Sequence, residues 1–202
     1  HAAVPGMKVT KLISPTPGNN YEFGVYCDIS DRYAVIGEQR FNTGLQGLAH
    51  VYDATTGAYL RTIKPAAGTP NDAFGSHIAI FGDRALIGTD GNTLVDPAYL
   101  VDLTNGKVLR TFLPTSPNSR GFGYTILLSA RHAIIGDSGD NNGQGIVYIF
   151  DLNTNDPPVT LTAPGGASGD SFGEYMYIHQ SLLLVAAPGK DSGKGAVYRF
   201  DL

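Results

Sequence analysis

Five side chains that could bind a cation or move a proton follow Phe-Gly pairs in this chain. Tyr26, Asp28, His77, Glu174 and Tyr175 each lie within five residues of the phenylalanine of such a pair. A histidine beside carboxylates and tyrosines can serve as an acid, a base or a cation ligand. The same set could instead fill a narrow channel as a hydrogen-bonded polar plug. These five are the candidate catalytic residues, provided that the fold brings them together.

A second group of polar side chains follows short apolar runs, at positions where loops are expected. Carboxylates, amides and occasional cations suit a hydroxyl-rich ligand or a polar protein partner, and loops on a rigid scaffold commonly carry function. The alternative is a set of solvated loops whose residues favour turns. The candidate ligand-binding residues are Glu38, Arg40, Asp90, Asn92, Asp137, Asp140, Asn141 and Lys190.

The segment Asp137-Ser-Gly-Asp140-Asn-Asn142 is the strongest metal candidate in the sequence. Its oxygen ligands would suit calcium, but it lacks the bidentate glutamate that completes a regular calcium loop. We predict no cofactor, and Asp137, Asp140 and Asn142 are the residues that could hold calcium. The chain has no Gly-x-Ser-x-Gly, phosphate-loop or His-Glu-x-x-His motif. The sequence therefore favours a binding module over an enzyme.

Composition excludes several classes of protein. Hydrophobic residues make up 42% of the 202 residues and charged residues only 16%, which does not fit a disordered chain. The net charge is −4 and no basic block occurs, so neither nucleic-acid nor anionic-membrane binding is expected. No apolar run approaches the roughly 18 residues of a membrane span.

The single cysteine, Cys27, excludes an intrachain disulfide, and we expect it to be a small buried residue. A chain rich in Gly, Asn, Ser, Thr and Tyr and poor in Lys and Glu favours a secreted, periplasmic or cell-surface protein.

Three markers repeat with a period of about fifty residues. The Phe-Gly pairs begin at 23, 74, 122 and 172, aspartates end apolar runs at 53, 102, 151 and 201, and prolines follow short runs at 15, 65, 114 and 164. Between them, β-branched and aromatic residues alternate with Gly, Asn and Asp, which predicts four short strands per unit and little helix. Repeats of four antiparallel strands arranged radially form a β-propeller.

The sequence predicts an all-β, four-bladed propeller with blades at about 16–65, 66–114, 115–164 and 165–202. The last unit stops after its third strand, and residues 7–15 contain a spare fourth strand, so we expect the N-terminal strand to close the last blade. The alternative is that four units form half of a larger ring completed by a second copy. The protein would accordingly be a monomer or a homodimer.

The repeat resembles the FG-GAP family, found in integrin α-subunits and in secreted bacterial proteins. The four Phe-Gly pairs carry the resemblance, together with the Ala186-Ala187-Pro188 sequence and the Ile-Gly pairs at the ends of the other second strands. The resemblance implies a secreted module that recognises a glycan or an extracellular protein through its loop face. It does not extend to the calcium site of the family, because the loops between first and second strands lack the alternating aspartates. The alternative function is an enzyme or small-ligand protein that uses the five candidate catalytic residues, which we expect to converge near the propeller axis and call the axial candidates.

Overall fold

The computed structural model describes residues 8–40, 43–66, 72–89 and 96–202, which form four separate antiparallel sheets. Blade one comprises β1 (Phe23–Ile29), β2 (Tyr33–Glu38), β3 (Leu48–Asp53) and β4 (Tyr59–Ile63). Blade two comprises β5 (His77–Phe81), β6 (Arg84–Gly88), β7 (Ala98–Asp102) and β8 (Val108–Phe112). Blade three comprises β9 (Phe122–Leu128), β10 (His132–Asp137), β11 (Ile146–Asp151) and β12 (Val159–Leu161), and blade four comprises β13 (Met176–His179), β14 (Leu182–Ala187) and β15 (Ala196–Asp201).

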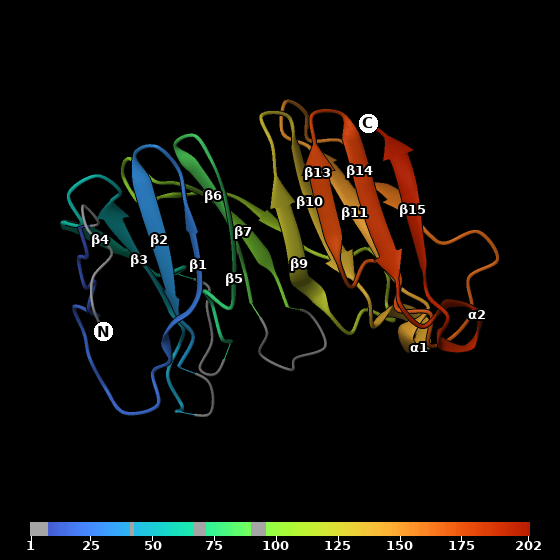
Figure 1. Cartoon of the computed structure of the whole chain (residues 1–202), viewed down its shortest axis with the longest axis horizontal. Helices are drawn as coiled ribbons and strands as arrows, with labels where there is room; N and C mark the ends of the chain where they lie inside the picture. The colour runs from blue at the N-terminus through green and yellow to red at the C-terminus, as the bar shows by residue number, and fades with distance from the viewer. Residues whose placement is uncertain (1–7, 41–42, 67–71, 90–95) are drawn as a thin grey trace.

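Each sheet has its strands in sequence order and in antiparallel register, as the hairpin signals predict. The only helical turns in the described part of the chain are α1 (Asp140–Gly143) and α2 (Lys190–Gly193). The first strands β1, β5, β9 and β13 contact one another in that order and line the inner side of the arc of blades. The turns α1 and α2, which connect the second and third strands of blades three and four, lie at one end of the blades, and the tight turns between first and second strands lie at the other (Figure 1). We call the end with α1 and α2 the loop face.

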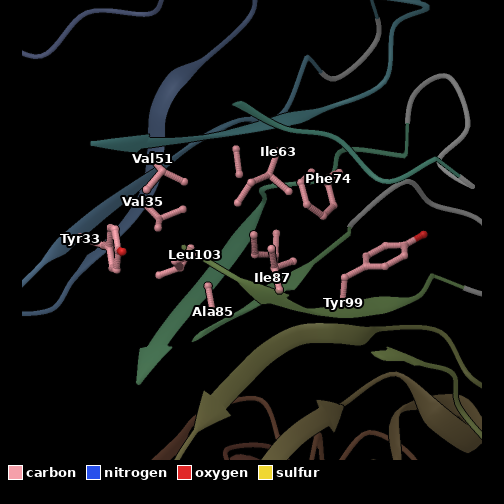
Figure 2. Close-up of a cluster of buried hydrophobic side chains, with 11 residues drawn as sticks. Tyr33, Val35, Val51, Ile63, Phe74, Ala85, Ile87, Tyr99 and Leu103 are labelled. Carbon is pink, nitrogen blue, oxygen red and sulfur yellow. The ribbon is translucent and has the colours of Figure 1, made fainter. Parts of the chain in front are cut away.

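The hydrophobic core lies between blades rather than within them. Three buried clusters fill the junctions of blades one and two, two and three, and three and four. Figure 2 shows the first of these, where Val35 and Val51 of blade one meet Ala85, Ile87 and Leu103 of blade two. Alternate strand residues face opposite neighbours, so a single sheet contributes one apolar face to each junction.

The Phe-Gly pair is explained by these junctions. Phe74 is fully buried between blades one and two, and Gly75 has a φ of 92°, a conformation that L side chains rarely adopt. A Cβ on Gly37, in the second strand of blade one, would come within 2.0 Å of the Gly75 carbonyl oxygen. Gly88 and Gly136 approach Gly123 and Gly173 in the same way. The repeated glycines are thus required by close backbone contact between consecutive blades.

The predicted closure of the last blade by the N-terminal strand is not confirmed. Blade four has three strands, residues 8–13 form no strand, and the blades make an open arc with its two ends far apart (Figure 1). Residues 8–16, which we call the N-terminal segment, lie on blade one instead. There the Tyr52 hydroxyl donates a 2.7 Å hydrogen bond to the Ile13 carbonyl.

The predicted burial of Cys27 is wrong, although the equivalent residues of blades three and four are buried. Ile126 and Met176 are buried, whereas Cys27 is exposed and Ile29 is 65% exposed. The reason is that no described sheet packs in front of blade one on that side.

Candidate functional site

The five axial candidates do not form one cluster. Tyr26 and His77 do meet: their ring centroids are 4.3 Å apart, and Tyr124 contacts the other side of the imidazole at 4.6 Å. The result is an aromatic ladder across β1, β5 and the start of β9. Tyr124 was not among the predicted site residues, because its position two residues after Phe122 predicts nothing about its reach toward the neighbouring blade.

His77 is buried, and none of the described residues forms an ion pair with it. It is 8% exposed, and its Nδ1 atom has no hydrogen-bond partner among the described residues. Burial lowers the pKa of His77 to about 4, so the ring is neutral at pH 7. A neutral imidazole between two tyrosine rings is a packing element of the inner wall.

The predicted axial carboxylates have other partners. One oxygen of Asp28 accepts a 2.7 Å hydrogen bond from the Ile80 backbone N–H and the other accepts from the Ile29 N–H, so Asp28 ties blade one to blade two. Glu174 contributes its backbone carbonyl, which accepts from the Thr125 hydroxyl at 2.7 Å and ties blade three to blade four. Tyr175 is 57% exposed on blade four.

Two predicted ligand-binding residues, Glu38 and Arg40, pair with each other inside blade one. The Arg40 guanidinium lies 2.6 Å from Oε1 of Glu38, whose side chain is fully buried. Oε2 of Glu38 lies 3.2 Å from Nε2 of His50, which is also fully buried, and Ser14 and Thr16 donate to the same carboxylate. Burial is the main cause that lowers the pKa of His50, while Glu38 acts in the opposite direction. This network joins β2, β3 and the N-terminal segment.

Four predicted residues lie on the loop face of blades three and four: Asp137, Asp140, Asn141 and Lys190. Asp140 accepts a 2.6 Å hydrogen bond from the Ser116 hydroxyl, and Lys190 lies 3.1 Å from Asp170. Asp90 and Asn92 lie outside the described residues.

The turns α1 and α2 have the same unusual backbone. Asn141 and Asn142 in blade three have φ values of 49° and 59°, and Asp191 and Ser192 in blade four have 53° and 61°. Non-glycine residues rarely adopt this left-handed conformation, and Asn and Asp are among those that adopt it most often. The Asn142 carbonyl accepts hydrogen bonds from the Gly169 N–H and the Ser168 hydroxyl, which fixes the loop of blade three to the loop that leads into blade four.

A small polar hollow opens on the loop face beside α1. It has a volume of about 90 Å³ and is lined by Asn118, Arg120, Asn141 and Asn142. Within the part of the chain that the structure describes, the Arg120 guanidinium makes no ion pair. The hollow therefore presents a cation and three amides on an ordered backbone.

The metal candidates are only partly brought together. Asp137 is fully buried at the end of β10, and its pKa is raised mainly by burial and in addition by the nearby Asp140. Its Oδ1 accepts a 3.2 Å hydrogen bond from the Arg120 N–H, whereas Oδ2 has no hydrogen-bond partner in the part of the chain that the structure describes. No group of three or more His, Cys, Asp or Glu side chains in the described ranges is arranged to hold a metal ion.

A larger cavity, which the sequence did not predict, lies at the opposite end of the blades. It has a volume of about 550 Å³ and is lined by the tight turns of blades three and four together with Phe81 of blade two. His132 and His179 face it with two serines and Gln180, above the apolar side chains of Leu128 and Ile178. The turns were identified from the sequence, but their convergence depends on the tilt between blades, which no residue pattern reports.

Comparisons with known proteins agree with this architecture. Residues 158–200, which comprise β12 and most of blade four, match the family model described as the FG-GAP repeat. The solved structure titled "Structure of Dos1 propeller" superposes with a TM-score of 0.59 and 17% sequence identity, over 84% of this chain and 40% of that chain. The chain thus spans less than half of that structure, and the likeness shows the fold. No curated protein matches the chain. In the described residues, no helix has the length and apolarity needed to cross a membrane.

Proposed function

Because this chain is an FG-GAP-type β-propeller, we propose that it is a binding module that holds a glycan or a protein partner on the loop face of blades three and four. FG-GAP repeats occur in extracellular and surface proteins, which supports a role outside the cell. The observation that carries the proposal is the polar hollow around Arg120, whose lining residues belong to loops fixed by backbone hydrogen bonds.

The hollow suits a single oxygen-rich group of a larger ligand. A guanidinium donates paired hydrogen bonds to a carboxylate, and the amides of Asn118, Asn141 and Asn142 can both donate to and accept from hydroxyls. A volume of about 90 Å³ is well below the roughly 300 Å³ of an ordinary small-molecule pocket. A carboxylate or hydroxyl of a glycan or of a protein side chain would enter it, and the rest of the ligand would lie across the loops.

The test compares Arg120→Ala with Arg32→Ala in binding to a panel of acidic and neutral oligosaccharides and to extracellular proteins. Arg32 is an exposed arginine at the opposite end of the blades from the loop face. Its guanidinium lies 3.1 Å from the carboxylate of Asp83. Loss of a charge-assisted hydrogen bond should weaken binding roughly 10- to 100-fold in Arg120→Ala. Arg32→Ala should bind as the wild type does. Equal binding by both variants would show that the loop face is not the site.

The cavity of about 550 Å³ supports a second candidate function, the binding of a small molecule. Its volume lies within the usual range for such ligands, and its apolar floor with a few polar groups has the ordinary composition of a ligand pocket. His179→Ala should then abolish the rise in melting temperature that a bound small molecule causes, while Arg120→Ala should leave it unchanged. The reverse pattern would favour the loop face.

A further inference from the structure

The two ends of the arc carry complementary sheet faces that are covered everywhere else in the chain. In second strands, Val35, Leu86 and Ile134 lie two residues before the junction glycine, and each is fully buried under the next blade. Leu184 has the same position in blade four and is 42% exposed.

The third strand of blade four shows the same difference. Ala49, Ala98 and Val147 are fully buried, whereas Val197 in the equivalent position is 65% exposed. The outer face of blade four is therefore an apolar junction face without a following blade. Adjacent exposed apolar groups of this kind mark interaction surfaces.

Blade one presents the other half of a junction. Ile29 of β1 is equivalent to Leu128 of β9, which is buried against the preceding blade, and Ile29 is 65% exposed. A cavity of about 340 Å³ lies between Ile29 and Ala34 on one side and Thr10 and Leu12 of the N-terminal segment on the other.

The N-terminal segment already has the place of an outer strand of a preceding blade. A Cβ on Gly57, in the loop between β3 and β4, would meet Thr10 and Leu12 at 3.0 Å. A Cβ on Gly106, in the equivalent loop of blade two, would meet Arg61 and Ile63 of β4. The segment thus lies on blade one as β4 lies on blade two, but among the described residues no three inner strands lie beside it.

Blade four has those three strands and lacks the fourth. We propose that a second copy of this chain inserts its β13–β15 sheet between the N-terminal segment and β1 of the first copy. Leu182 and Leu184 would enter the cavity beside Ile29, and residues 8–13 would pair with the free edge of β15. Two such joints, related by a twofold axis, would give a ring of eight blades and would pair the otherwise free edge of β15 in each copy.

The new joint would differ from those within the chain at one place. Ala186 replaces the glycines at 37, 88 and 136, so the backbones must lie slightly farther apart there.

The first experiment measures the mass of the protein in solution over a range of concentrations. Wild type should have twice the chain mass of 21.4 kDa. Leu184→Asp, which places a charge on the junction face, should be monomeric. Leu109→Asp makes the same change at a position that is 52% exposed on the outer strand of blade two, and it should remain dimeric. Because both leucines are exposed, neither variant should lose its fold.

Cys27 provides an independent measurement, since it is the only cysteine and lies on the exposed side of β1. Its reaction with a thiol reagent should slow severalfold as the wild-type protein dimerises, and should stay fast in Leu184→Asp. A monomer with a reactive Cys27 at every concentration would overturn the proposal. A monomer with a protected Cys27 would also overturn it, because the four blades would then close on themselves.

Discussion

The end of the second strand holds a buried carboxylate in two of the four blades. The two carboxylates differ in how many of their oxygens have hydrogen-bond or ion-pair partners. Glu38 in blade one and Asp137 in blade three have the same position in the repeat, and both side chains are fully buried. Glu38 receives hydrogen bonds or ion pairs from Ser14, Thr16, Arg40 and His50 on both of its oxygens. Asp137 accepts from the Arg120 N–H on Oδ1, and no described residue donates to its Oδ2.

The difference shows that position in a repeat does not determine the role of a polar residue. In blade one, the N-terminal segment supplies two hydroxyls, and His50 stands where the other blades have Tyr99, Tyr148 and Tyr198. In blade three, the equivalent Tyr148 hydroxyl accepts instead from the Ser116 N–H. A buried charge is tolerated where its partners are complete and is costly where they are not.

Removal of the Glu38 carboxylate should have the largest effect on stability. Glu38→Ala leaves the His50 ring and the Arg40 guanidinium, whose side chain is only 13% exposed, without their acidic partner. Breaking such a buried pair costs about 3–5 kcal/mol. Urea unfolding at pH 7 measures the loss of unfolding free energy.

Asp137→Ala is the matched control, because it deletes the carboxylate at the same position in blade three. Its loss should be smaller, about 1–2 kcal/mol, since only the donors to Oδ1 lose their acceptor. Equal losses in the two variants would contradict the view that the completeness of the partners distinguishes the two blades.

The sequence predicted the architecture well because the fold repeats the same local rules four times. Alternating apolar residues define the two faces of each sheet, and Phe-Gly pairs mark where one blade meets the next. These are local patterns with a fixed period, so the four antiparallel sheets followed from them. The openness of the arc did not, because it depends on the angles between blades.

The candidate site was harder to predict, and the reasons are physical. Arg40 and Glu38 look like loop residues available to a ligand, but they pair within blade one. Asp28 looks like a partner for His77, but both of its oxygens accept backbone N–H groups. Such competition among neighbours decides which polar groups remain available, and a single sequence does not report it.

His77 extends the comparison to a buried base, which burial keeps neutral at pH 7. The unfolded pKa of a histidine is 6.5, and burial lowers the folded value to about 4. The folded protein therefore binds fewer protons than the unfolded chain between these pH values, so stability should fall as the pH drops from about 6.5 to 4. The loss should be on the order of 3 kcal/mol.

His77→Phe should keep the ring between Tyr26 and Tyr124 and remove this pH dependence. Denaturant unfolding of wild type and variant at several pH values between 4 and 7 measures the difference. Parallel stability curves for the two proteins would show that His77 is not held neutral by burial.

The smallest effect should come from Asp137→Asn, which sharpens the comparison by removing charge without removing volume. The pKa of Asp137 is raised above its usual 3.8, chiefly by burial, so the folded protein holds a proton that the unfolded chain has released. Its contribution to stability is therefore lost as the pH rises from 3.8 through the folded pKa.

At pH 7 the Asp137→Asn substitution should raise the unfolding free energy by about 1 kcal/mol, because it leaves no unpaired buried charge. The gain should shrink as the pH falls through the folded pKa of Asp137, because the wild-type carboxyl then becomes protonated. A variant less stable than wild type at pH 7 would show that the charge has a partner. If added calcium then stabilised only the wild type, that partner would be a cation bound at Oδ2.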